Sequence, residues 1–340
     1  MDISNTKKGF ALFTEQLNIL LDNHAVTNKN EDFFVQIAKA KHYNRWFTET
    51  FVRLRLKSIL NFLLSPDFEN VYNKWAAFKG NSVKKIGIFS EEHIPLEEFP
   101  LLLAILVSGN AFQYKTHDKS DKVLVGVFNL LGNCVPDFKE RIEFSDMSLK
   151  NAESLIWTQQ EDKNTQQLKY LTKRLSLLDT RYQSVAILKG DEDSEELSLI
   201  GNDIFNFFGQ GSGNVRKVYI PQGFDIRKLY KAIESWYSIM DSSPYANNYQ
   251  YHQSVYLMNR IDHLDNGFLL VKEDTSFRAP TGVLFYEFYS DYKKQLSLLE
   301  NSDQCSNIYL SLPSGTKHKA FGDSANQILL PPEKLTDLIK

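Results

Sequence analysis

The sequence predicts an α/β protein in which helices cover parallel sheets. Two patterns and the chain length support this class. Short apolar segments of strand composition alternate with helical segments through the middle of the chain. That alternation restarts near residue 183, and 340 residues are more than one small core accommodates. Because hydrophobic residues make up 42% and charged residues 24%, the composition is that of a folded globular protein.

The composition argues against several classes of function. The formal net charge is -3, without the basic excess that is typical of a nucleic-acid binder. The first residues lack an apolar signal segment, and the apolar run 99–107 is about half a membrane span, so we expect a buried helix there, no membrane span and a cytoplasmic protein. The two cysteines, Cys134 and Cys305, and the scattered histidines show no metal-ligand spacing, so we predict no metal site.

The first half of the chain begins with helical segments between residues 9 and 65. Thr48 followed by Glu49 is typical of a helix start, and Ser65-Pro66 ends that helix. Beyond it, apolar strands and helices alternate. The expected order is strand 85–89, helix 101–106, strand 111–115, helix 123–131 and strand 154–157.

The second half repeats the alternation. The expected order is strand 185–188, a helix ending near Phe208, a glycine-rich turn at 209–213, strand 215–220, helix 226–239, and strands at 267–271 and 282–289. We therefore predict a first domain over 1–183, including the helical N-terminal segment, and a second over 184–316. The remaining residues, 317–340, show few signals and are expected to form a C-terminal tail.

Three stretches carry a resemblance to a known family: residues 38–49, residues 203–215, and residues 245–249 with 264–274. Together they resemble the LuxC-type acyl-CoA reductases, a branch of the aldehyde-dehydrogenase fold. The resemblance implies a Rossmann-like cofactor domain within 1–183 and a catalytic-type α/β domain over 184–316. It also implies reduction of a fatty acyl thioester to an aldehyde with NADPH. In that reaction a thiol takes the acyl group first, because a thiolate forms readily and leaves easily.

Serine stands where this family keeps its catalytic cysteine. The turn around it contains Gly209, Gly211, Ser212, Gly213 and Asn214. A serine hydroxyl needs an adjacent base to act as a nucleophile, and the neighbouring residues offer none. His252 and His263 are the histidines that the fold would have to bring close. The alternative is that Ser212 is a small residue in a tight turn whose glycines permit close approach of another group.

The residues that would hold the cofactor also differ from the family pattern. Where relatives have a small residue and an asparagine after the first strand, this chain has the acidic stretch 91–99 with Glu92 and His93. Where they open a helix with glycine and serine, it has 157–165. Carboxylates oppose phosphate, which binds at backbone N–H groups and cations. By resemblance, Lys115 would lie near the adenosine ribose and Glu273 near the nicotinamide ribose.

These departures favour a reductase-like protein that has lost NADPH-dependent acyl reduction and binds no cofactor, acting as a non-catalytic or acyl-binding partner subunit. The alternative is an active acyltransferase, hydrolase or reductase that uses Ser212 as acyl acceptor, with NADP(H) required if reduction remains. Cys305 is expected to be a structural residue at a strand start. Tyr- and Asn-rich tracts at 235–237 and 244–251 are typical of interfaces, and the resemblance implies a homodimer.

Overall fold

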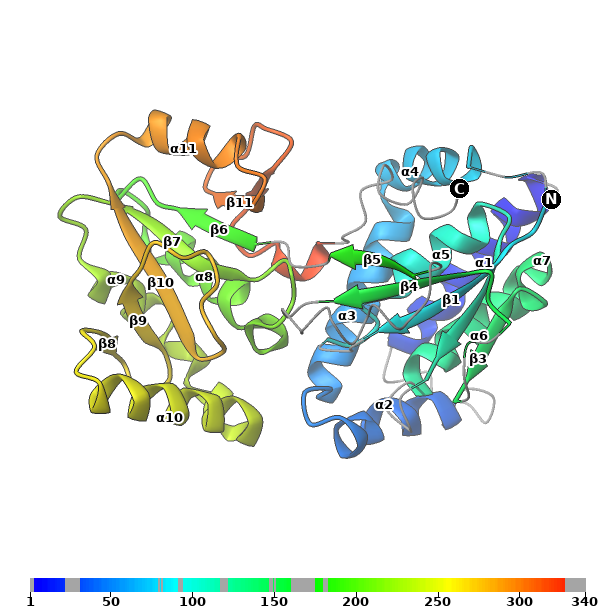
Figure 1. Ribbon diagram of the computed structural model, residues 1–340, viewed down its shortest axis with the longest axis horizontal. Coiled ribbons are helices and arrows are strands. Elements are labelled where there is room, and N and C mark those ends of the chain that lie inside the picture. Colours follow the sequence, from blue (N-terminus) through cyan, green and yellow to red (C-terminus); the bar gives the residue numbers. More distant parts are fainter. Residues whose placement is uncertain are drawn as a thin grey trace. The chain divides into compact units, whose positions relative to one another are not determined.

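The structure is a computed structural model. It describes residues 3–21, 31–78, 80, 82–90, 94–116, 122–146, 149, 151–159, 175–179 and 183–327. The chain divides into two compact units, one formed by residues up to 181 and the other by Tyr182–Gln327. Each unit is an α/β assembly built on its own, mainly parallel, sheet (Figure 1).

The first unit begins with helices and continues into a five-stranded parallel sheet of order β3-β2-β1-β4-β5. Its helices are α1 (Ile3–Leu21), α2 (Glu31–Tyr43), α3 (Glu49–Leu64), α4 (Pro66–Ala76), α5 (Phe99–Val107), α6 (Lys122–Cys134) and α7 (Pro136–Lys139). Its strands are β1 (Lys85–Ser90), β2 (Ala111–Lys115), β3 (Ile142–Ser145), β4 (Ser154–Gln159) and β5 (Leu175–Asp179).

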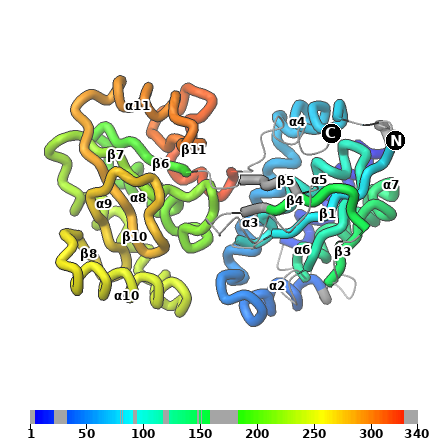
Figure 2. The backbone as a smooth tube through the Cα atoms, in the orientation of Figure 1, coloured from blue at the N-terminus to red at the C-terminus, as the bar shows by residue number. Residues whose placement is uncertain are grey.

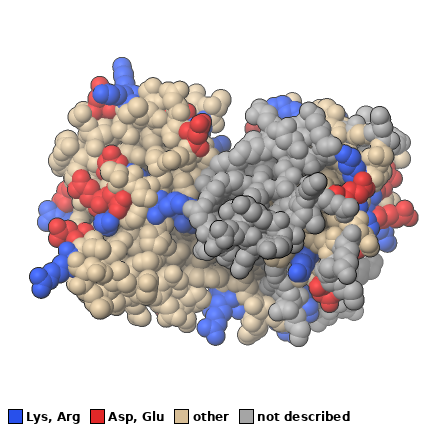
Figure 3. Space-filling model, viewed as in Figure 1, with Lys and Arg blue, Asp and Glu red and all other residues tan. Residues whose placement is uncertain are grey.

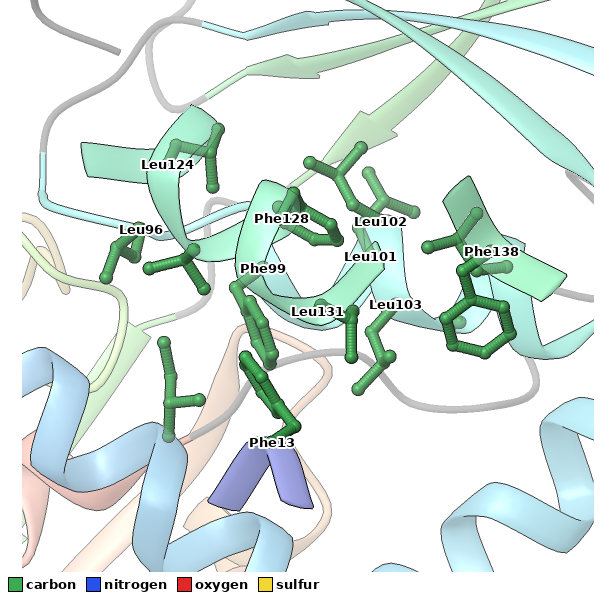
Figure 4. Close-up of a cluster of buried hydrophobic side chains, with 14 of the residues drawn as sticks. Phe13, Leu96, Phe99, Leu101, Leu102, Leu103, Leu124, Phe128, Leu131 and Phe138 are labelled. Carbon is green, nitrogen blue, oxygen red and sulfur yellow. The ribbon is translucent and has the colours of Figure 1, made fainter. Parts of the chain in front are cut away.

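Local sequence explains where these helices begin and how they pack. Thr48 caps α3, because its side chain accepts a hydrogen bond from the Phe51 N–H at 3.3 Å. All nine residues of α5 are buried, which confirms the prediction of a buried helix at the apolar run. Figure 4 shows Phe13 of α1 against Phe99 of α5, in a core that continues through apolar side chains of α6 and α7. This core lies between the helical layer and the sheet.

The second unit is built on a seven-stranded sheet of order β12-β11-β6-β7-β10-β9-β8, in which only the pair β8–β9 is antiparallel among the described strands. Its strands are β6 (Gln183–Ile187), β7 (Val215–Pro221), β8 (Leu264–Asp265), β9 (Leu270–Glu273), β10 (Val283–Tyr289), β11 (Cys305–Leu310) and β12 (His318–Ala320). Its helices are α8 (Ser194–Phe205), η2 (Asn206–Gly209), α9 (Ile226–Ala232), η3 (Glu234–Asp241), α10 (Ser243–Met258), α11 (Tyr292–Glu300) and η4 (Ser324–Asn326).

The end of this unit differs from the sequence expectation. Residues 318–327, expected within a tail, form β12 and η4, and β12 pairs with β11 through Ile308 and His318. The three residues of β12 are too few to show the alternation of apolar and polar residues that predicts a strand. Backbone hydrogen bonds to β11 define this strand instead. In Figure 2 the orange β11 lies beside the green β6, so the first strand of this unit pairs with its second-to-last strand in sequence.

The helix expected over 226–239 is also different, because α9 ends at Ala232 and the 3₁₀ helix η3 follows. Trp236 of η3 stacks on Phe205 of α8, with ring centroids 5.4 Å apart. Gly201 makes this approach possible, since a Cβ there would lie 2.8 Å from the Trp236 ring. The residues that were expected to continue α9 thus form the 3₁₀ helix η3, which packs against α8 through Trp236.

Candidate functional site

The chain enters the glycine-rich turn through a strained backbone. Phe207 and Phe208 have positive φ angles of 52° and 58°, and Gly209 follows at 72°. Left-handed conformation costs a non-glycine residue roughly 1–2 kcal/mol. Both phenylalanines are buried, at 4% exposure each, so packing holds them in this conformation. At Gly209 a Cβ would also lie 2.9 Å from the Ile204 carbonyl oxygen, so this position requires glycine.

Asn214 connects the two ends of this turn, which we call the Ser212 turn (residues 209–214). Its Oδ1 accepts a hydrogen bond from the Gly211 N–H at 2.8 Å. Its Nδ2 donates to the carbonyl oxygens of Asp203 and Asn206, both at 2.9 Å. Asn214 is 2% exposed, so these three bonds satisfy groups that water does not reach.

Two strands hold the backbone at Ser212 itself. The Ser184 hydroxyl of β6 donates to the Ser212 carbonyl at 2.8 Å and accepts from the Asn307 amide at 3.0 Å. The Tyr309 hydroxyl of β11 donates to the Gly213 carbonyl at 2.8 Å. These bonds fix the direction of the peptide planes that flank Ser212.

The segment after β12 closes the other side of the turn. At Gly213 a Cβ would lie 2.8 Å from the Ser324 carbonyl oxygen, so only glycine fits. The same segment is tied to α8, because the Asp203 carboxylate accepts the N–H groups of Gly322 at 2.7 Å and Ser324 at 2.9 Å. Burial raises the pKa of Asp203 to about 7, although both backbone hydrogen bonds favour its charged form.

The structure brings no base to Ser212 among the residues it describes. Ser212 is 8% exposed. His252 contacts the rings of Tyr251 and Tyr256, and the Nδ1 of His263 lies 2.7 Å from the Ile261 carbonyl oxygen, which can only accept a hydrogen bond from it. Within the described chain neither imidazole is hydrogen-bonded to the Ser212 hydroxyl. The hydrogen bonds position the backbone on either side of Ser212, and no described side chain is seen to accept its hydroxyl proton.

Cys305 is not an alternative nucleophile. It is the first residue of β11 and 2% exposed, with its Sγ 3.5 Å from the Asn307 carbonyl oxygen. Burial raises the pKa of its thiol to about 12. Because the thiolate is the reactive form, this cysteine is inert near neutral pH.

In the first unit, the carboxyl edge of the sheet is where an open α/β fold binds a nucleotide. Strand order reverses between β1 and β4, since β2 and β3 follow β1 on one side and β4 and β5 lie on the other. Phe89 of β1 and Trp157 of β4 pack edge to face there, with ring centroids 5.6 Å apart. Lys115, at the end of β2, places its Nζ 5.4 Å from the centre of the Phe89 ring.

A buried carboxylate stands at the same edge. Glu98 is 3% exposed and is the N-cap residue of α5, the helix that follows β1. It accepts a hydrogen bond from the Ser90 hydroxyl at the end of β1. Arg55 of α3 is equally buried, and desolvation lowers its pKa while the charges of Glu97 and Glu98 oppose that shift. The chain therefore places its own acidic and basic side chains, Glu98 and Arg55, near the end of β1 and the start of α5.

The other residues of the expected cofactor side are placed as follows. Glu273 ends β9 in the second unit, exposed and in register with Tyr286, whose pKa is raised by burial and by the Glu273 charge. Lys115 belongs to the first unit. Residues 91–93, with Glu92 and His93, and 160–165 lie outside the described residues. No group of three or more metal-binding side chains occurs in the described ranges.

Several residues of the Ser212 turn network were not singled out from sequence. Ser184 and Tyr309 are hydroxyl residues of strands that lie far from the turn along the chain, and no local pattern marks them. Asp203 lies inside the stretch 203–215 that carries the family resemblance, so that stretch could have marked it as part of the site.

Comparison with known proteins identifies the fold. No family model and no curated protein matches the sequence. Solved structures do match. Aldehyde dehydrogenase 21 from Physcomitrella patens superposes with a TM-score of 0.59 at 11% identity, over 91% of this chain and 74% of that one. An NAD-dependent benzaldehyde dehydrogenase from Corynebacterium glutamicum also superposes with a TM-score of 0.59 at 11% identity, over 94% of this chain and 82% of that one. An acetylating aldehyde dehydrogenase from Geobacillus thermoglucosidasius superposes with a TM-score of 0.55 at 12% identity, over 96% of this chain and 78% of that one.

The chain therefore has the aldehyde-dehydrogenase fold, as the sequence predicts, with a Rossmann-like first unit and a catalytic-type second unit. Neighbours with this fold include NAD-dependent enzymes. Glu98, the N-cap residue of α5, directs its carboxylate to the Ser90 hydroxyl and makes no side-chain cap hydrogen bond to the helix. No described helix is both long and apolar enough to span a bilayer.

Proposed function

We propose that this chain is a LuxC-type reductase relative that has lost nicotinamide-dependent acyl reduction and serves as a non-catalytic, acyl-binding partner subunit. The observation that carries the proposal is the buried Glu98 carboxylate at the N-terminus of α5, hydrogen-bonded to Ser90. A dinucleotide pyrophosphate at this edge would meet the Glu98 carboxylate, whose charge the buried Arg55 offsets only in part, so the two negative groups are expected to repel each other.

The Ser212 turn supports the same conclusion from the second unit. Its backbone is fixed by Ser184, Asn214 and Tyr309, but a serine hydroxyl without a base is a weak nucleophile. An acyl-serine would moreover be an ester, which accepts hydride less readily than a thioester. Such a turn retains the shape of an acyl site without the chemistry of the first step.

Ligand titration tests this proposal. We expect isothermal titration of the full chain with NADPH, and separately with NADH, to give no dissociation constant tighter than about 1 mM, near −4 kcal/mol. A fatty acyl-CoA is expected to bind, but NADPH is not expected to be oxidised in its presence. Oxidation would be detected as a loss of the absorbance of the reduced nicotinamide. Micromolar NADPH binding together with turnover of the acyl-CoA would overturn the proposal.

A second function is favoured by how completely the Ser212 turn is built, and it uses Ser212 as an acyl acceptor. In that reaction the Oγ attacks the thioester carbonyl, an ester bond forms, the C–S bond breaks, and the CoA thiolate leaves and takes up the hydroxyl proton. The alternative requires an increase in intact mass equal to one acyl group after incubation with acyl-CoA, mapped to the peptide that contains Ser212. An unchanged mass after long incubation excludes it.

A further inference from the structure

A surface hollow of about 310 Å³ lies in the first unit, where α1, the end of α3 and the start of α4 meet. This volume is near the lower limit of pockets that bind small molecules. The two later helices are separate because Ser65, which precedes Pro66, has the extended backbone that a following proline favours. We call the site the Lys7 hollow; its lining includes Lys7, Phe10, Leu64, Phe68, Glu69 and Tyr72.

Three aromatic rings form one wall of the Lys7 hollow. The centroid of the Phe10 ring lies 5.5 Å from that of Phe68 and 5.9 Å from that of Tyr72. The centroids of the Phe68 and Tyr72 rings are 6.1 Å apart, and all three pairs meet edge to face, an arrangement that aromatic rings prefer. Leu64 extends this wall and is 64% exposed. Water that covers such a surface is released when an apolar group takes its place, which favours binding.

An exposed ion pair lies beside this apolar wall. The Lys7 Nζ donates a hydrogen bond to Oε1 of Glu69 at 2.7 Å, and the two side chains are 62% and 65% exposed. An ion pair this exposed stabilises the fold little, because water and salt screen it. An ammonium group has three donors, and this pair uses one of them. Lys7 can therefore bind a second carboxylate, or exchange Glu69 for it, at little cost.

Charges around the hollow favour an anion. Burial raises the pKa of Tyr72, and the positive charges of Lys7 and Arg141 both oppose this rise, so a positive potential reaches the aromatic wall. The field of the whole chain is weak by comparison, because the net charge is -3 and basic and acidic side chains are interspersed on the described surface that Figure 3 shows. The groups closest to the hollow therefore decide the sign of a bound ligand.

We propose that the Lys7 hollow binds a small monocarboxylate with an aromatic or other apolar body. The body lies against the aromatic wall, and the carboxylate accepts hydrogen bonds from the Lys7 ammonium. Such charge-assisted bonds are stronger than those between neutral groups. The Glu69 carboxylate competes with the ligand for the same ammonium. The site uses no residue of the Ser212 turn or of the nucleotide edge, so it goes beyond the proposed function.

Titration of the full chain with phenylbutyrate, followed by NMR of the ligand, tests this inference. A ligand of about twelve non-hydrogen atoms is expected to bind with a Kd on the order of 0.1–1 mM. Phenylbutylamine has the same ring and chain but carries an ammonium group, so Lys7 repels it, and it is expected to bind about tenfold more weakly. The inference is overturned when the amine binds as tightly as the carboxylate, or when phenylbutyrate at about 5 mM does not bind.

Two substitutions in the ion pair are expected to act in opposite directions. Lys7→Gln removes the partner of the ligand carboxylate and is expected to raise the Kd of phenylbutyrate about tenfold. Glu69→Gln removes the competing carboxylate and is expected to lower this Kd about threefold. Glu49→Gln is the control, because it breaks the ion pair with Arg53 on α3 but lies outside the lining of the hollow. An unchanged Kd in Lys7→Gln, or a raised Kd in Glu69→Gln, contradicts the proposed site.

Leu64→Asn tests the apolar wall. The side chain is largely exposed, so we expect the fold to tolerate the change, and the Kd of phenylbutyrate is expected to rise about fivefold. Leu298→Asn is the matched control, since Leu298 is 58% exposed on α11 in the second unit. Circular dichroism confirms folding of each variant. Equal Kd values for Leu64→Asn and wild type would overturn the inference. NADPH and acyl-CoA are absent from every titration, so the outcome is independent of the proposed function.

Discussion

The Ser212 turn and the carboxyl edge of the first sheet differ in what they have kept. In the turn, hydrogen bonds from Ser184, Asn214 and Tyr309 fix the backbone around a residue that lacks a recorded base. At the sheet edge, a buried glutamate stands at the helix N-terminus where a phosphate would bind. On the proposed function, the first region keeps a scaffold for an acyl group, whereas the second no longer suits a dinucleotide.

The two regions also differ in how much of the fold depends on them. The Ser212 turn joins β6, β11 and the segment after β12, so its hydrogen bonds also hold the second unit together. A change there leaves buried polar groups unpaired and destabilises the unit. Side chains at the end of a strand that line a ligand site carry less of the fold, so substitutions there cost less stability.

The largest expected effect tests whether the turn carries the fold. Asn214→Ala removes the partners of one N–H and two carbonyl groups, and each unpaired buried group costs roughly 1–3 kcal/mol. We expect the free energy of unfolding in urea to fall by about 4 kcal/mol. The control is Asn301→Ala, which removes an exposed hydrogen bond to the Ser297 carbonyl. Equal losses in the two variants would contradict a structural role for the turn.

The next prediction concerns acylation at the Ser212 turn when a thiol replaces the serine hydroxyl. Ser212→Cys places a thiol in a turn whose backbone is unchanged, and at pH 8.5 about half of an ordinary thiol is ionised. We expect acylation by a fatty acyl-CoA on the order of 100-fold faster than in wild type, about 2.7 kcal/mol in barrier, measured by peptide mass spectrometry. NADPH is expected to release no aldehyde from the acylated variant.

The control for this experiment is Ser297→Cys, which introduces an exposed thiol on α11. Acylation that is no faster in Ser212→Cys than in Ser297→Cys would mean that the turn no longer favours an acyl thioester. Release of aldehyde from Ser212→Cys would instead mean that the nucleotide edge still functions. With this variant, acylation reports on the Ser212 turn and aldehyde release reports on the nucleotide edge.

A further effect, seen as a dependence on pH, concerns Asp203, which ties the segment after β12 to α8. Its pKa is about 7 when folded and near 3.9 when unfolded, so the folded chain binds the proton more tightly. Its contribution to stability is fully present below about pH 4 and is lost as the pH rises toward 7, by up to about 1.4 kcal/mol per pH unit. Asp203→Asn removes this dependence.

Urea unfolding of wild type and Asp203→Asn at several values between pH 4 and pH 7 measures the effect. Other carboxylates titrate in both proteins, so they cancel in the difference between the two free energies. We expect wild-type stability to decline relative to the variant as pH rises. A difference that stays constant across this range would show that Asp203 is ionised throughout in the folded protein.

Local patterns predicted much of the fold and less of the site. The fully apolar α5 and the Thr48 cap follow from neighbouring residues, and the resemblance indicated the fold that the solved structures share. Ser212 and Asn214 are two positions apart in sequence, so their turn could be predicted. The bonds from Ser184 and Tyr309 were not, because they join the turn to residues 28 and 96 positions away. The strand β12 was missed because backbone pairing, which side-chain patterns do not record, defines it.

The clamp on Asp203 has a consequence for how the second unit folds. Its partners Gly322 and Ser324 lie 119 and 121 positions later in the chain. During synthesis, α8 and the turn that follows it emerge long before the residues that close over them. Contacts of such high sequence separation form slowly and leave intermediates that expose apolar surface. We therefore expect the carboxylate of Asp203 to remain in water until the last strand has joined the sheet, so that completion of the turn is a late step in the maturation of the protein.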